Sequence, residues 1–335
     1  MEPTELVPFG KTSLTTTRLG LGSAPLGGLF NPVSDATAHG VVQHAYDVGL
    51  RFYDTAPLYG YGSAEQRMGH VLAQRPRDSF VLATKVGRLI RPREAAGSGV
   101  DEGGAGQFRD APPLVPVFDF SYDAVMRSFE ESLKRLGVDR IDVLHIHDPD
   151  EHFAEALSGA YKALDKLRSE GTTKAVGSGM NQAEMLARFA READFDCFLV
   201  AGRYTLLDQA ALPELLPICE QKGIAIVIGG VYNSGILANL DNPDRATFNY
   251  KPAEQRWLEK ARAIKAVCDR HNVPLQAAAL QFPLAHPAVA VVLTGARSTE
   301  ELDQNLAFMR QPIPADLWAE LKSTGLLPAE APTPA

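Results

Sequence analysis

The chain has 335 residues, of which 45% are hydrophobic and 22% charged, and its formal net charge is -8. This composition is typical of a globular protein with a sizeable core, and the negative charge argues against a nucleic-acid-binding surface. The three cysteines, Cys197, Cys219 and Cys268, lie too far apart in the sequence to indicate a disulfide framework or a zinc site.

The N-terminus and the apolar segments bear on where the protein works. The first residues include Glu2 and Glu5 and lack the apolar run of a secretory signal. The sequence has no stretch of about 18 uninterrupted apolar residues that could span a membrane. We therefore expect a cytoplasmic monomer or small homo-oligomer that acts on a small molecule, with no nucleic-acid or membrane partner.

Strand-like and helical segments alternate along the chain. Residues 6–14 predict a small hairpin that turns at Gly10 and Lys11. Eight strands are predicted after it, at residues 19–22, 51–54, 80–85, 141–147, 174–178, 197–201, 224–228 and 289–293. Helices are predicted at residues 35–48, 63–73, 122–136, 153–167, 182–190, 212–221, 254–271, 275–284, 299–309 and 315–322.

This alternation, without an obvious linker, predicts an α/β protein with a (β/α)8 TIM barrel, a single domain over residues 1–327. A doubly wound sheet is the alternative. It would normally show a Gly-rich G-x-G-x-x-G turn after an early strand. Here the first strand gives Gly20-Leu21-Gly22-Ser23-Ala24-Pro25 instead, and Pro25 stands where a helix should begin. The barrel is therefore the favoured fold.

Three segments depart from the regular alternation. Residues 88–120 are rich in glycine, proline and charge, and residues 233–252 follow the seventh strand. Loops this long are usually functional or disordered, and both would hang over the C-terminal face of the barrel as lids or substrate walls. The proline-rich residues 328–335 are expected to form a disordered tail.

Three chemically useful side chains stand at the ends of consecutive strands. Asp54 and Tyr59 lie where the second strand breaks at Pro57 and Gly60, and Lys85 ends the third strand. Side chains at the C-terminal ends of barrel strands converge on one volume. A cation there could lower the pKa of the tyrosine and let it exchange protons near neutral pH. Each residue alone could be structural, as a turn, packing or strand-end residue, and the combination favours a site.

The fourth strand carries two imidazoles. His145 and His147 alternate onto the same face of the strand. A His-x-His pair on a barrel strand can be half of a metal site, as in amidohydrolases, but this needs further His or Asp ligands at later strand ends. The last four strands end in segments that offer none, so we expect no metal.

The run Asp54-Thr55-Ala56-x-x-Tyr59-Gly60 and the strand-ending Lys85 and His147, in that order, resemble the aldo-keto reductases. The resemblance extends from the N-terminal hairpin to about residue 310. It implies that Tyr59 is the general acid/base, that Lys85 and Asp54 tune it, and that His147 orients the substrate carbonyl or hydroxyl. His145 has no role in the family.

The same resemblance implies a nicotinamide cofactor. The family's amide-binding segment after the fifth strand is changed here, so that Ser178 or Asn181 would supply the contact. Gly229 occupies the place of the aromatic residue that stacks on the nicotinamide in many members, and Tyr232 is the candidate to replace it. The resemblance therefore implies a modified nicotinamide pocket.

The segment after the eighth strand resembles the family's adenosine-phosphate loop. Gly295 and Arg297 lie in this loop, and Gln304 and Asn305 would lie near the adenine. Glu301 would repel a 2′-phosphate and could accept from a ribose hydroxyl, whereas Arg297 suits a phosphate. We expect NAD or NADP, with a preference for NAD. Alternatively, Arg297 and Glu301 are only a solvated ion pair.

Within the family, the resemblance is to bacterial sugar dehydrogenases of the D-threo-aldose 1-dehydrogenase type. It rests on the run from Asp54 to Gly60, on Leu-His-Ile-His-Asp-Pro-Asp in the fourth strand, and on the insertion 88–120. It implies oxidation of an L-fucose-like aldose at the anomeric carbon to a lactone. The alternatives are pyridoxal 4-dehydrogenase, a general NADPH-dependent aldehyde reductase, and a non-enzymatic cofactor-sensing subunit. Polar side chains that could bind sugar hydroxyls, or be ordinary surface residues, are Asp148, Arg203 and Asn233.

Overall fold

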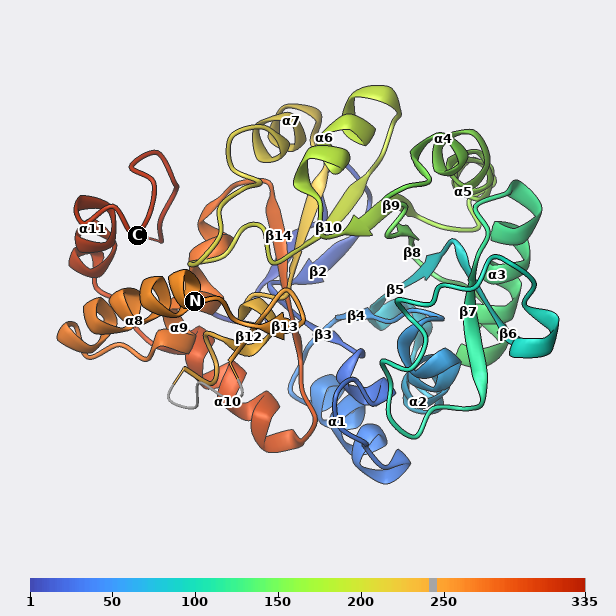
Figure 1. Cartoon of the computed structure of the whole chain (residues 1–335), viewed down its shortest axis with the longest axis horizontal. Coiled ribbons are helices and arrows are strands. Elements are labelled where there is room, and N and C mark those ends of the chain that lie inside the picture. The colour runs from blue at the N-terminus through green and yellow to red at the C-terminus, as the bar shows by residue number, and fades with distance from the viewer. Residues whose placement is uncertain (241–245, 335) are drawn as a thin grey trace.

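A closed barrel of eight parallel strands forms the centre of the computed structural model, which describes residues 1–240 and 246–334 (Figure 1). Around the barrel the strands are ordered β10-β11-β14-β3-β4-β5-β8-β9. Their bounds are β3 (Leu19–Gly22), β4 (Phe52–Asp54), β5 (Val81–Val86), β8 (Val143–His147), β9 (Ala175–Met180), β10 (Cys197–Ala201), β11 (Ala225–Gly229) and β14 (Val289–Gly295). The predicted (β/α)8 barrel is confirmed.

Helices surround the barrel on its outside (Figure 1). They are α1 (Asp35–Asp47), α2 (Ser63–Leu72), α3 (Tyr122–Leu136), α4 (Phe153–Glu155), α5 (Tyr161–Ser169), α6 (Ala183–Glu192), α7 (Leu215–Lys222), α8 (Gln255–Arg270), α9 (Leu275–Gln281), α10 (Thr299–Arg310) and α11 (Ala315–Ser323). A π-helical turn joins α4 to α5, so the predicted helix 153–167 is continuous but locally wider. Within the described residues, we find no helix long and apolar enough to cross a membrane.

The N-terminal hairpin covers the end of the barrel at which the strands begin. Strand β1 (Leu6–Pro8) pairs with β2 (Thr15–Thr17) in antiparallel fashion, as predicted. Phe9 is fully buried, with its ring centroid 5.6 Å from that of Phe52 inside the barrel. The Lys11 amide donates to the Gly223 carbonyl just before β11. The opposite end of the barrel is therefore the one left for a site.

The insertion 88–120 is more regular than the sequence predicted. Strand β6 (Arg88–Pro92) pairs along its length with β7 (Leu114–Phe118). Apolar side chains of both strands, among them Leu89, Ile90 and Val115, are buried, which explains why the segment forms a sheet despite its many glycines.

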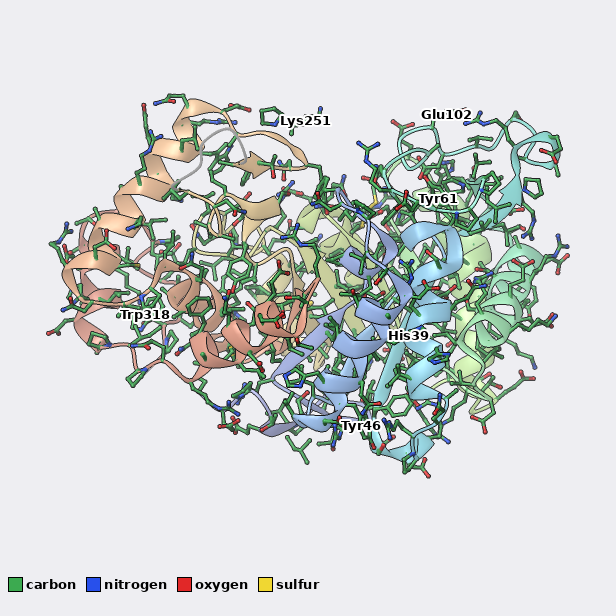
Figure 2. The ribbon with its side chains drawn as sticks, turned by 90° about the horizontal axis from the view of Figure 1, so that it is seen from below. His39, Tyr46, Tyr61, Glu102, Lys251 and Trp318 are labelled. Carbon is green, nitrogen blue, oxygen red and sulfur yellow. The ribbon has the colours of Figure 1, made fainter. Side chains whose placement is uncertain are left out.

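The segment 233–252 contains a second, shorter strand pair, β12 (Thr247–Phe248) with β13 (Lys251–Pro252). Residues 241–245 of this segment lie outside the described residues. Figure 2 shows Lys251 of this segment and Glu102 of the insertion at the same end of the molecule, with Tyr46 at the other end. Both long segments thus stand at one end of the barrel.

The C-terminal segment packs against the rest of the protein as far as residue 334, whereas the sequence predicted disorder from 328. Leu327 and Ala331 are buried, and the Ala331 amide donates to the Pro328 carbonyl at 3.2 Å. The burial of these two apolar side chains holds the segment in place, and a proline count does not reveal it. Ala335 lies outside the described residues, and the division of the chain at residue 327 stays a prediction.

Candidate active site

A buried ion pair joins the ends of two neighbouring strands. Lys85 on β5 donates from Nζ to Asp54 Oδ1 at 2.6 Å, at the end of β4, and to the Thr55 carbonyl at 2.9 Å. Both charged side chains are only 1% exposed. Burial raises the pKa of Asp54, although the ammonium opposes this shift. Removal of either charge would therefore leave the other unpaired in the barrel.

Tyr59 is held above this pair by a tight turn. Gly60 has a left-handed φ of 60°, and a Cβ there would lie 2.5 Å from the Gly27 carbonyl oxygen, so only glycine fits. The turn places the half-buried Tyr59 ring with its centroid 4.7 Å from Lys85 Nζ. The chain thus brings Asp54, Lys85 and Tyr59 together, as the sequence predicted.

The pKa of Tyr59 shifts in the direction opposite to our expectation. Burial and the Asp54 carboxylate raise it well above its usual range. The Lys85 ammonium lies over the ring face, and both of its hydrogen bonds go to Asp54 and Thr55 rather than to the phenol oxygen. In this structure the phenol therefore carries its proton at neutral pH and is a proton donor.

His147 ends β8 at the edge of the same group. Its ring stands at 87° to the Tyr59 ring, with 5.8 Å between the centroids. Burial and the Arg88 guanidinium lower the pKa of His147 well below its usual range, so the imidazole is neutral. Its Nε2 lies 3.4 Å from Asp148 Oδ2. Because a carboxylate only accepts, the tautomer with its proton on Nε2 is favoured.

His145 lies deeper in the barrel, beside Lys85 in the strand register. It is fully buried, and burial lowers its pKa to about 3. Gly177 leaves room for the ring, since a Cβ there would lie 2.8 Å from His145 Nδ1. In the part of the chain that the structure describes, no group of three or more His, Cys, Asp or Glu side chains could hold a metal ion.

A buried arginine that was not predicted from the sequence ties the insertion to β8. Arg88 donates from Nε to Asp101 Oδ2 at 2.8 Å and from Nη1 to the His147 carbonyl at 3.0 Å. Its guanidinium also lies 4.5 Å from the centroid of the Phe118 ring. A charged residue between Gly87 and two apolar residues was the only available signal. Arg88 thereby links the insertion to the backbone of His147.

Replacing Arg88 with methionine should lower the free energy of unfolding by about 3–5 kcal/mol, because Asp101 is 8% exposed and would lose its partner. Chemical denaturation followed by circular dichroism measures this loss. Arg93→Ala is the matched control in the same insertion, since its ion pair with Glu102 is exposed and should leave the midpoint unchanged. Equal, small effects of both changes would contradict a structural role for Arg88.

The two candidates for the nicotinamide amide differ in their surroundings. Ser178 is buried and donates to the Ile146 carbonyl at 3.0 Å, so its hydroxyl proton is already used. Asn181 makes a longer bond, 3.3 Å, to the Ala201 carbonyl and lines a small cavity with Asn233 and Tyr250. Of the two, Asn181 is the residue placed to reach a ligand.

The remaining predicted cofactor residues lie on two neighbouring elements, the end of β11 with the loop that follows it, and helix α10. Gly229 ends β11, and the Tyr232 phenol that follows it donates to Asn305 Oδ1 of α10 at 2.8 Å, which joins this loop to the helix. Gln304 is exposed on α10. The structure therefore pairs Tyr232 with Asn305.

Arg297 and Glu301 form the ion pair that was the alternative interpretation. The Arg297 amide donates to Glu301 Oε2 at 2.8 Å, and its Nη2 lies 3.0 Å from Oε1. Ser298 caps α10 by accepting from the Glu301 amide. Gly295 lies so close to Pro25 that a Cβ at position 295 would be 2.5 Å from Pro25 Cγ. Both charges thus stand at one helix N-terminus, each partly neutralised by the other.

A dinucleotide fits these residues in two respects. The buried Asn233 Oδ1 has no hydrogen-bond partner among the described residues and lines the cavity beside Asn181. The N-terminus of α10, after Gly295, offers backbone donors of the kind that bind phosphate. An amide group and a phosphate group could therefore be held at these two places.

The chain is similar to known proteins over nearly its whole length. The sequence model of the aldo/keto reductase family matches residues 18–325. Pyridoxal 4-dehydrogenase of Microbacterium luteolum is 41% identical over 98% of this chain and 99% of its own. D-threo-aldose 1-dehydrogenase of a Pseudomonas species is 43% identical over 92% of this chain and 94% of its own. An aldo-keto reductase structure from Bacillus halodurans, 22% identical, covers 98% of both chains with a TM-score of 0.75, which shows the shared fold.

Proposed function

Because the chain belongs to the aldo/keto reductase family, we propose that it is a nicotinamide-dependent dehydrogenase that oxidises the anomeric hydroxyl of an aldose to a lactone. The observation that carries the proposal is the stack of Tyr59 over the buried Lys85–Asp54 pair, with His147 beside it. The similarity to D-threo-aldose 1-dehydrogenase supports the substrate class, with L-fucose as the first sugar to test. The cytoplasmic location and the monomer or small homo-oligomer stay predictions.

In this mechanism each residue has one task. A bound nicotinamide would accept the hydride from the carbon that bears the reacting hydroxyl. Tyr59 takes the hydroxyl proton in oxidation and returns it in reduction. Lys85, held by Asp54, stabilises the phenolate that must form before oxidation. Neutral His147 donates from Nε2 to the reacting oxygen and orients it.

Cofactor binding is proposed for residues at two places along the barrel rim. Asn181 and Asn233, which line the same small cavity, would hold the nicotinamide end. Gly229 at the end of β11 and Tyr232 in the loop after it would lie beside them. The adenosine end would lie at Gly295 and the N-terminus of α10. NAD is the preferred cofactor in this proposal, because Glu301 neutralises the one cation of the loop that would suit a 2′-phosphate.

Pyridoxal is the second candidate substrate, since pyridoxal 4-dehydrogenase is 41% identical to this chain over 98% of its length. Initial rates of NAD and NADP reduction, measured with a panel of aldoses and with pyridoxal, distinguish a sugar dehydrogenase from a pyridoxal dehydrogenase. A strong rate with L-fucose or another aldose is the expected result. Turnover of pyridoxal alone would replace the sugar assignment, and aldehyde reduction by NADPH without any oxidation would overturn the dehydrogenase proposal.

Replacing Glu301 with glutamine should raise the ratio of kcat/KM with NADP to that with NAD by roughly three- to tenfold. The change frees the Arg297 guanidinium, which then suits a 2′-phosphate. Steady-state rates with both cofactors measure the ratio. Glu300→Gln, on the same helical turn, is the control and should leave it unchanged. An unaltered ratio in Glu301→Gln would show that this ion pair does not face the ribose.

A further inference from the structure

Asp148 follows His147 directly at the end of β8 in an unusual backbone conformation. Its φ is +41°, in the left-handed region that few residues other than glycine adopt, aspartate and asparagine being the more frequent exceptions. The Asp148 amide donates to the Gly179 carbonyl at 3.0 Å, which helps to hold the conformation. Backbone strain of this kind is concentrated at functional sites. The chain thus keeps a strained residue next to His147.

The carboxylate of Asp148 has two polar neighbours, but they do not use up its capacity to accept hydrogen bonds. Its Oδ2 lies 3.4 Å from His147 Nε2 and 3.5 Å from Arg88 Nη2, and both distances exceed a normal hydrogen bond. Arg88 is held from the other side by Asp101 and is only 7% exposed, whereas the Asp148 side chain is 28% exposed. Asp148 therefore has free acceptor capacity on the side that faces solvent.

Asp148 remains an acceptor at neutral pH. Burial raises its pKa to about 6, and the Arg88 guanidinium opposes this shift. The other two polar candidates lie beside other groups, and Asn233 Oδ1 lines the cavity next to Asn181. Arg203 donates to Asn249 Oδ1 at 2.9 Å, and Asn233 donates to the Gly202 carbonyl at 3.1 Å. Of the three, Asp148 is the one whose side chain stands beside His147.

We propose that Asp148 determines specificity by accepting a hydrogen bond from the substrate hydroxyl on the carbon next to the reacting carbon. In a gauche vicinal pair, the two oxygens stand about a hydrogen-bond length apart. The 3.4 Å between His147 Nε2 and Asp148 Oδ2 is slightly longer than that spacing, so each of the two atoms can reach one of two adjacent substrate oxygens. The substrate class is therefore a 2-hydroxy aldehyde or its cyclic hemiacetal, as in an aldose. This inference rests on the proposed oxidoreductase reaction at Tyr59 and His147.

The test compares two aldehydes that differ only in the neighbouring hydroxyl. Reduction of lactaldehyde and of propanal by NADH or NADPH is measured for the wild-type protein, and the wild type should favour lactaldehyde roughly 10- to 100-fold in kcat/KM. In Asp148→Gly, which suits the left-handed backbone, this preference should fall to within about threefold. The rate with propanal is the reference for each variant, because any effect of the change on His147 acts on both aldehydes and leaves their ratio unaltered.

Two further variants make the result specific. Asp148→Asn keeps the size of the side chain, tolerates a positive φ and should give an intermediate preference, which covers the case of an unstable glycine variant. Asp150→Ala, on the same loop, is the control and should keep the full preference. A wild type without preference, or a preference that survives in both Asp148 variants, overturns the inference.

The test also separates this inference from the proposed function. A lactaldehyde preference that depends on Asp148, without oxidation of any aldose, would remove the sugar dehydrogenase and leave the role of Asp148 standing. Oxidation of an aldose, together with a lactaldehyde preference that does not depend on Asp148, would support the sugar dehydrogenase and remove the role of Asp148. A wild type inactive with every aldehyde and sugar would overturn both.

Discussion

Replacing Tyr59 with phenylalanine is expected to lower kcat by roughly 10²- to 10⁴-fold, the range for loss of a general acid or base. The change removes only the hydroxyl. The ring keeps its contacts with Lys85, at 4.7 Å, and with His147, at 5.8 Å. Cofactor affinity should therefore stay the same. Steady-state rates and cofactor titration by protein fluorescence measure the two effects.

The pH dependence of the wild type should carry the signature of the same hydroxyl. Because burial and Asp54 raise the pKa of Tyr59 well above its usual range, oxidation needs the minor, deprotonated form, and its rate should rise with pH above neutrality. Reduction uses the abundant protonated form and should not rise. The residual oxidation by Tyr59→Phe should lose this dependence.

Tyr61→Phe is the matched control for this prediction. Tyr61 lies in the same turn, and its phenol donates to the Gly104 carbonyl of the insertion at 3.0 Å, away from Lys85. Its loss should change kcat by no more than about threefold. A Tyr59→Phe enzyme with near-wild-type turnover, or an equal loss in both variants, would falsify the assignment of Tyr59 as acid/base.

Replacing Lys85 with methionine should lower the free energy of unfolding by about 3–5 kcal/mol and also abolish most turnover. The stability is lost because Asp54 is 1% exposed and would be left as an unpaired carboxylate inside the barrel. The turnover is lost because nothing then stabilises the phenolate of Tyr59. Urea unfolding and steady-state rates measure the two losses on the same samples.

The pH dependence of that instability follows from Asp54. Burial raises the folded-state pKa of this carboxyl, and the variant removes the ammonium that opposes the shift. A carboxyl whose folded pKa is raised binds its proton more tightly when folded. Lys85→Met should therefore lose further stability as the pH rises above about 4, the unfolded value for aspartate.

The double variant Asp54→Asn/Lys85→Met separates structure from chemistry. It leaves no buried charge, so it should recover most of the stability lost in Lys85→Met. Turnover should stay low, because the cation is still missing. Recovery of turnover in the double variant would show that Lys85 acts only by holding the fold.

Much of the fold and the convergence of the site were predictable because they follow from local patterns. Alternating strands and helices define the barrel, and the ends of its parallel strands must meet at one face. Asp54 and His147 end their strands and Lys85 is the last residue but one of β5, so their convergence needed no knowledge of distances. The catalytic roles stay predictions, because they rest on the family resemblance and on geometry rather than on a measured reaction.

What could not be predicted depends on the path of the chain between the strands. The contact of Arg88 with Asp101 arises only because the insertion folds into β6 and β7. The direction of the Tyr59 pKa shift depends on the burial of the phenol and on the nearby Asp54 carboxylate, which spacing does not encode. The left-handed backbone at Asp148 has no sequence signal either, since aspartate is common in ordinary turns.

The arginine bridge has a consequence for protein engineering. Arg88 belongs to the insertion, yet it donates to the carbonyl of His147 and faces Asp148. A chimera that exchanges residues 88–120 for the matching segment of a relative therefore transplants part of the catalytic scaffold along with the substrate wall. Grafts that exchange positions 88, 101 and 148 together keep that scaffold intact. Recombination points placed inside this trio break it.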